Sequence, residues 1–162
     1  MRMKIKSSFR IVAPAMIALG FAVMGPGLGA AGAQPVPCPG TSCDLAVTVT
    51  GTPPGPVVIT ANDVKMERRK RGVIITWKLA DNSAFEFRPG SIKAHVGAPV
   101  NGKPTTTQAE WDAQCQFVST NGRNYKVRNR NDVAATLAYD ITVYHKATGT
   151  PYTLDPVIFN DP

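Results

Sequence analysis

The chain has 162 residues and a formal net charge of +7, from 18 Lys and Arg against 11 Asp and Glu. Four of the basic residues lie within the first ten positions, so residues 34–162 carry 14 basic and 11 acidic residues and a net charge of +3. This small excess is only weak evidence for a nucleic-acid or membrane partner. The length allows one domain, or one domain and a processed segment.

Residues 1–33 have the three parts of a secretory signal peptide. The basic start is followed by the apolar segment 11–24 and by small residues that end in Ala31-Gly32-Ala33. The apolar segment is shorter than the roughly 20 residues of a membrane-spanning helix. We therefore expect cleavage after Ala33, a periplasmic or secreted protein, and no transmembrane anchor after cleavage. The alternative is an uncleaved N-terminal anchor.

The three cysteines, Cys38, Cys43 and Cys115, follow this segment. Oxidising compartments favour disulfides, and the Pro-Gly-Thr-Ser sequence between Cys38 and Cys43 can form a turn that brings their Cβ atoms together. We predict a Cys38–Cys43 disulfide and a buried, unpaired Cys115; the alternative pairs Cys115 with one of the other two. The Pro- and Gly-rich residues 34–44 are expected to be a flexible arm in front of a domain that spans residues 45–162.

Period-two alternation of apolar and polar residues predicts short strands along the whole domain. In the clearest of these, Val73, Ile75, Trp77 and Leu79 share one face, which we expect to be buried. Residues 108–114 can form one or two helical turns, and the sequence shows no convincing helix longer than ten residues. Frequent turn signals then predict an all-β fold, a single antiparallel sandwich of about seven strands. The candidate segments for these strands are 45–50, 57–60 with its possible continuation 64–66, 73–79, 84–88, 91–96, 115–119, 125–128, 139–144 and 152–158.

Two segments carry a resemblance to a known group of domains. They are Ile75-Thr-Trp-Lys-Leu79 with the following Phe85 and Phe87, and residues 137–143 with Tyr152-Thr-Leu-Asp-Pro-Val-Ile-Phe-Asn160. They resemble small bacterial immunoglobulin-like sandwich domains that end in a Y-x-LDP-x-I-x-N hairpin. The resemblance covers residues 74–160 and implies an immunoglobulin-like fold, but no activity, since none is established for the group. We expect Asp155-Pro156 to be structural, with the proline at an edge or bulge.

The sequence contains no recognisable catalytic or cofactor motif. Its only histidines are His95 and His145, and nothing in the sequence places either of them near a candidate nucleophilic serine, as a catalytic triad requires. We expect no enzyme activity, no cofactor and no metal. The alternative is an exported redox or copper-binding, cupredoxin-like protein that uses Cys115 and a histidine. Cupredoxins have a histidine shortly after the cysteine in the same loop, whereas here no histidine follows Cys115 within 15 residues.

Two basic runs are the strongest surface signal. Arg68, Arg69, Lys70 and Arg71 lie between two predicted strands, where a hairpin tip is the simplest geometry, and Arg123, Lys126, Arg128 and Arg130 form a looser run. A run of like charge is either a solvated turn that discourages sheet pairing or a contact for an anionic partner. Our hypothesis is an exported, non-enzymatic binding or interaction module for an envelope protein or an anionic surface, without specific nucleic-acid binding. The four residues Arg68 to Arg71 are its candidate anion contacts.

Overall fold

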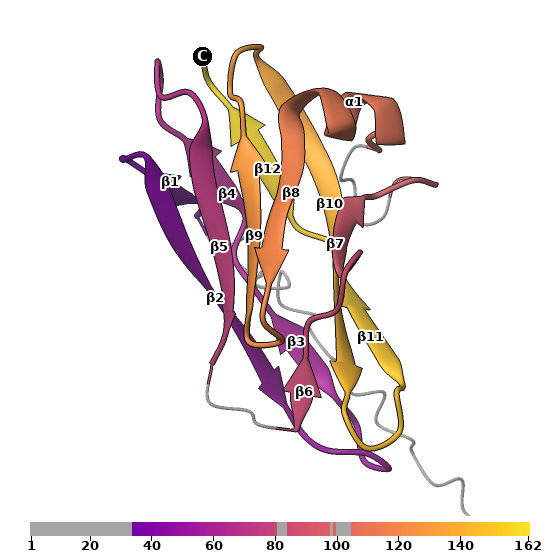
Figure 1. Ribbon diagram of the computed structural model, residues 1–162. Helices are drawn as coiled ribbons and strands as arrows, with labels where there is room; N and C mark the ends of the chain where they lie inside the picture. The colour runs from indigo at the N-terminus through magenta and orange to yellow at the C-terminus, as the bar shows by residue number, and fades with distance from the viewer. Residues whose placement is uncertain (1–33, 81–83, 98, 100–104) are drawn as a thin grey trace, which may run out of the picture. The chain divides into compact units, whose positions relative to one another are not determined.

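The computed structural model describes residues 34–80, 84–97, 99 and 105–162 (Figure 1). The predicted signal peptide, residues 1–33, lies outside these residues. The described part forms twelve strands and one helix, α1 (Gln108–Gln114). The strands are β1 (Val36–Cys38), β2 (Ser42–Thr50), β3 (Val58–Thr60), β4 (Val64–Met66), β5 (Val73–Leu79), β6 (Phe85–Glu86), β7 (Ile92–Ala94), β8 (Cys115–Thr120), β9 (Asn124–Asn129), β10 (Ala135–His145), β11 (Pro151–Leu154) and β12 (Val157–Asn160).

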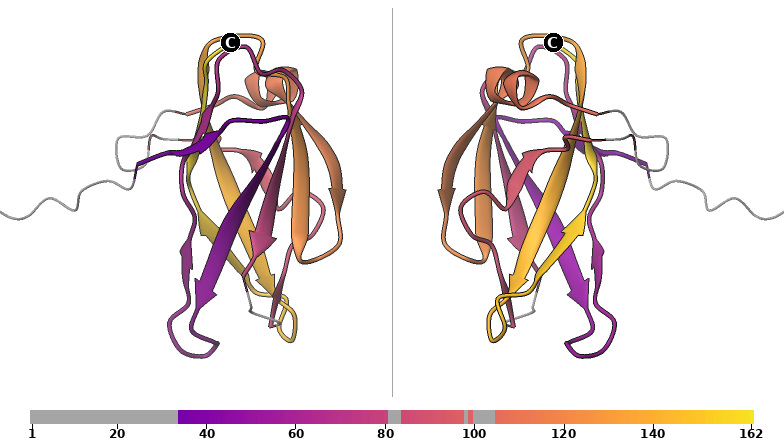
Figure 2. Two further views of the ribbon diagram at one scale, coloured as in Figure 1. Left: turned by 90° about the vertical axis from the view of Figure 1, so that its left-hand side faces the viewer. Right: turned by 90° about the vertical axis from the view of Figure 1, so that its right-hand side faces the viewer.

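The strands form two sheets, which confirms the predicted all-β sandwich. A five-stranded sheet has the order β3-β2-β5-β9-β8, and a seven-stranded sheet has the order β1-β4-β12-β10-β11, with β6 and β7 also paired to β10. Figure 2 shows the two sheets as two layers, with α1 at the same end as the C-terminus. No helix of the described residues is long and apolar enough to cross a membrane.

The sheets are mixed, which corrects the prediction of a purely antiparallel sandwich. β2 runs parallel to β5, and β4 runs parallel to both β1 and β12. A parallel pair needs a crossover connection of a dozen or more residues, and residues 51–72 provide it between β2 and β5. Strand direction across such a connection leaves no mark on the period-two pattern, so the sequence did not reveal it.

Alternating side chains fill the space between the sheets. Every second residue of β2 is buried, from Cys43 to Val49, and Trp77 in β5 is fully buried as predicted. The indole of Trp77 lies edge-on to the ring of Tyr139 in β10, with ring centroids 5.4 Å apart. Trp111 of α1 stacks on Tyr139 at 5.7 Å. The predicted helical turns at 108–114 therefore contribute a side chain to the core.

The N-terminal segment differs from the predicted flexible arm. Val36–Cys38 pairs with β4, the backbone N–H of Val36 donates to the carbonyl of Asp63 at 2.8 Å, and Cys38 is fully buried. The predicted Cys38–Cys43 disulfide is present, with the Cα atoms 5.3 Å apart, and Cys115 is buried and unpaired. Because β1 and β2 belong to different sheets, the disulfide closes the turn where the chain passes from one sheet to the other.

The predicted last strand is interrupted at Asp155-Pro156. β11 pairs with the second half of β10, from Ile141 onward, whereas β12 pairs with its first half, up to Ala138. The interruption falls beside Tyr139, whose backbone N–H donates to the carbonyl of Pro156 at 3.1 Å. Proline has no N–H to give to a ladder, so it fits this break between two pairings.

Candidate functional site

The first basic run forms an exposed turn, Glu67–Gly72, which we call the basic tip. It joins β4 of the seven-stranded sheet to β5 of the five-stranded sheet, so it is a crossing between sheets and not the predicted hairpin tip. The N–H of Lys70 donates to the carbonyl of Glu67 at 3.2 Å, which places Arg69 third in the turn with φ 64°. A left-handed conformation costs a non-glycine residue about 1–2 kcal/mol.

Asn131 holds the basic tip from below. Its side-chain Nδ2 donates to the carbonyls of Glu67 at 3.2 Å and Lys70 at 2.8 Å, and its own N–H donates to Oδ1 of Asn129 at 2.9 Å. Asn131 is fully buried with φ 46°, a conformation that asparagine tolerates better than most residues. The backbone of the tip is therefore fixed while its charged side chains remain exposed.

The structure brings most of the second basic run next to the tip. The N–H of Gly72 donates to the carbonyl of Arg130 at 3.2 Å, and Arg128 lies opposite Ile74 in the β5–β9 ladder. Lys126, Arg128 and Arg130 are exposed, because the residues that alternate with them point into the core. Arg123 lies at the other end of β5, where its carbonyl accepts from Leu79. The "basic surface" hereafter means Arg68, Arg69, Lys70, Arg71, Lys126, Arg128 and Arg130.

Only one member of the basic surface has an ion-pair partner within the described part of the chain. Arg130 contacts Asp132 at 2.6 Å. The hydrogen bond from Gln114 and the contact with Arg130 lower the pKa of the Asp132 carboxyl. The other ion pairs found there use cations outside the basic surface. The positive charge of the remaining six side chains therefore faces solvent.

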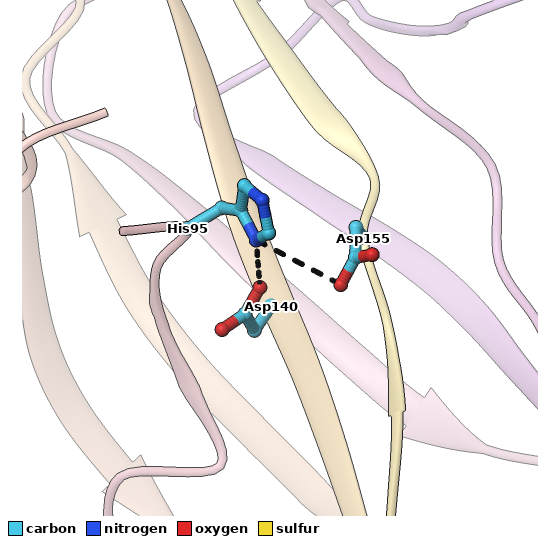
Figure 3. A group of neighbouring side chains, drawn as sticks. All are labelled: His95, Asp140 and Asp155. Carbon is cyan, nitrogen blue, oxygen red and sulfur yellow. Dashed lines mark hydrogen bonds and ion pairs between the residues drawn. The ribbon is translucent and has the colours of Figure 1, made fainter. Parts of the chain in front are cut away.

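A second cluster lies on the seven-stranded sheet, where β10 is flanked by β7 on one side and by the β11–β12 break on the other. His95 follows β7, Asp140 lies within β10, and Asp155 lies in the break (Figure 3). Nδ1 of His95 is 2.6 Å from Oδ1 of Asp140 and 3.9 Å from Oδ1 of Asp155. The three side chains are 13%, 16% and 31% exposed, respectively.

The backbone fixes this second cluster. Tyr139 and Ile141 point into the core, so Asp140 between them points to the outer face of the sheet. The N–H of His95 donates to the carbonyl of Ala138 at 3.0 Å, and the carbonyl of His95 accepts from Thr106 at 3.0 Å. From the sequence, we considered His95 for a catalytic triad and as a copper ligand, treated Asp155 as a structural residue, and did not single out Asp140. The alternating sequence predicts that Asp140 points outward from its strand, but it does not predict which residues of the neighbouring strands lie beside it.

The cupredoxin-like alternative does not find its ligand set in the described residues. The His95 cluster is the one group of three or more potential His, Cys, Asp or Glu ligands among them, and it does not contain Cys115. Burial, with a smaller contribution from Asp112, raises the pKa of the Cys115 thiol, which disfavours the thiolate that a metal would need. In His145, Nδ1 instead lies 3.0 Å from the hydroxyl oxygen of Thr148, and the centroid of the imidazole ring is 5.3 Å from that of Phe85.

The protein is therefore an all-β sandwich with one disulfide, and it carries the basic tip and the His95 cluster on its surface. No model of a known protein family matches the chain, and no curated protein matches it. The resemblance to immunoglobulin-like domains that end in a Y-x-LDP-x-I-x-N hairpin therefore stays a prediction.

Proposed function

We propose that this chain is an exported, non-enzymatic β-sandwich module that binds anionic components of the cell envelope through the basic surface. Export is supported by the Cys38–Cys43 disulfide, since such bonds persist in oxidising compartments and are rare in the cytosol. The ligand chemistry is a closely spaced set of phosphate, carboxylate or sulfate groups, because four adjacent cations at the tip match such a set and no single small anion.

The observation that carries the proposal is the conformation of Arg69. At the third position of this turn, φ is 64°, and glycine would adopt that angle without steric strain. The chain keeps arginine there, in a turn whose backbone is held by Asn131 and whose side chains are exposed. Backbone strain retained at a fixed, exposed and charged position is typical of a binding site.

Retention on a heparin resin and co-sedimentation with phosphatidylglycerol vesicles test this proposal, and together they distinguish a polymer from a lipid ligand. The test variant is Arg68→Gln with Arg71→Gln. The matched control is Arg123→Gln with Lys146→Gln, which removes the same charge. Arg123 lies at the other end of β5, and Lys146 lies in the β10–β11 turn, at the opposite end of the domain from the C-terminus (Figure 1).

We expect the tip variant to elute at lower salt, or to sediment less, than both the wild type and the control. Exposed charges act weakly and are screened beyond about 8 Å at physiological salt, so binding should be low in affinity and strongest at low salt. Equal behaviour of the two double variants would show that the basic tip is only a solvated turn.

A further inference from the structure

Three side chains of types that can bind a metal ion lie together on the outer face of the seven-stranded sheet, and they come from three separate segments. His95 directly follows β7, Asp140 lies in the middle of β10, and Asp155 lies between β11 and β12 (Figure 3). They share no residue with the basic surface. We propose that His95, Asp140 and Asp155 form a binding site for a divalent transition-metal ion of the Zn²⁺ class, with Nδ1 as the imidazole ligand.

The spacing of the ligand atoms suits one ion. Zn²⁺ binds nitrogen and oxygen at about 2.0–2.2 Å, which places neighbouring ligand atoms about 2.8–3.6 Å apart in tetrahedral or octahedral geometry. The two distances from Nδ1 of His95, 2.6 Å to Asp140 and 3.9 Å to Asp155, fall on either side of that range. One ligand atom from each residue lies within 4.8 Å of the other two. Small side-chain shifts would therefore bring the three ligand atoms to the spacing that one ion requires.

The charge of the cluster also favours a cation. Two carboxylates share one imidazole, so even a protonated His95 leaves a net charge of −1 within the cluster. The three side chains are mostly buried, and charges in such a position are screened less by water and salt than exposed ones. Lys93 is the cross-strand neighbour of Asp140, but it is exposed and takes part in none of the ion pairs found among the described residues. A divalent cation would be attracted by the two carboxylates of this cluster.

The donor atoms select the class of metal. Calcium and magnesium take oxygen ligands almost exclusively, so an imidazole nitrogen argues against them. Soft ions such as Cu(I) prefer thiolate or thioether sulfur, and this cluster offers none. One imidazole and two carboxylates suit Zn²⁺ and its neighbours Co²⁺ and Ni²⁺. Three protein ligands leave at least one coordination position of such an ion open.

The backbone presents the ligands before any ion binds. β7 and β10 are paired from Ile92 to Ala94, directly before His95. On the other side, the hydrogen bond from Tyr139 to the carbonyl of Pro156 fixes the residue that follows Asp155. Ligands whose neighbouring backbone is already held by hydrogen bonds lose less conformational entropy on binding, which favours affinity.

Calorimetric titration of the purified, untagged protein with Zn²⁺, and visible absorption during titration with Co²⁺, test the proposal. We expect one ion per chain. Asp140→Asn and Asp155→Asn preserve shape and remove one anionic ligand each, and His95→Gln removes the nitrogen ligand; each should weaken binding about 10-fold or more. Asp44→Asn and His145→Gln are the matched controls, and they should bind as the wild type does.

A second measurement does not depend on any variant folding correctly. In long-range ¹H–¹⁵N spectra of the wild-type protein, Zn²⁺ should shift Nδ1 of His95 and leave His145 unchanged. The proposal is overturned if no stoichiometric ion binds, if the shifted nitrogen belongs to His145, or if Ca²⁺ binds as tightly as Zn²⁺. Failure of this test leaves the anion-binding proposal standing, because the two sites use different residues.

Discussion

Nε1 of Trp77 donates a hydrogen bond to the phenolic oxygen of Tyr139 across the sandwich, at 3.2 Å. Trp77 lies in β5 of one sheet and Tyr139 lies in β10 of the other, and both are fully buried. Burial raises the pKa of the Tyr139 phenol, so the oxygen stays protonated and the pair stays neutral. Because Trp111 of α1 also stacks on Tyr139, these three side chains connect both sheets and α1 within the core.

We expect Trp77→Ala to lower the free energy of unfolding by about 3–5 kcal/mol, as large-to-small core changes do. Tyr139→Phe keeps the ring but leaves the buried indole N–H without an acceptor, so it should cost about 1–3 kcal/mol. Urea unfolding followed by tryptophan fluorescence measures both. A loss below about 1 kcal/mol for Trp77→Ala would contradict the core described here.

Reduction of the Cys38–Cys43 disulfide should destabilise the domain by about 2 kcal/mol, the loop-entropy value for so short a loop. The measurement compares thermal unfolding with and without dithiothreitol in a Cys115→Ala variant, so that no other thiol contributes. Because the bond closes the turn between the two sheets, amide exchange should accelerate most in β1. Unchanged exchange in β1 would show that its pairing with β4 is sufficient by itself.

Arg69→Gly should stabilise the protein by up to about 1 kcal/mol while weakening its retention on heparin. Glycine relieves the left-handed strain at this position, although it also gives the unfolded chain more freedom. Equilibrium unfolding and heparin elution of the same sample test both effects. Arg71→Gly is the matched control, since φ at Arg71 is negative and the same charge is removed; it should weaken retention without adding stability. If Arg69→Gly is more stable but is retained on heparin as strongly as the wild type, Arg69 does not contribute to binding.

The mature chain should begin at Gln34, as the small residues at Ala31 and Ala33 predict. Intact-mass measurement of the exported fraction determines the N-terminus directly. A chain that still begins at Met1 would contradict the export proposal.

The parts of the fold that the sequence predicted are those governed by local alternation. β2, β5 and β10 each show it over several residues, and the burial of Trp77 follows from it. β1 was missed because Val36 lies between two prolines, which disfavour a ladder. Its pairing comes from β4, and the neighbouring disulfide keeps it in place. The sequence around β1 does not predict these contacts, because they depend on residues that are distant in the chain.

The same limit explains the candidate sites. The basic tip was visible because its four charges are consecutive, but its link to Arg130 depends on the turn being a crossing between sheets. The His95 cluster depends on the lateral order of β7, β10 and the β11–β12 break. Its members are 45 and 15 positions apart in the chain, so no spacing rule could have grouped them.

The most direct test of the proposed function is the salt dependence of heparin binding, compared between the wild type and a variant with Arg68, Arg69, Lys70 and Arg71 all changed to Gln. Each cation that contacts a polyanion releases counterions and steepens the plot of log K against log salt by roughly one. If the basic tip binds, the wild-type slope should exceed that of the variant by roughly two to four. Equal slopes in the two proteins would contradict the proposal.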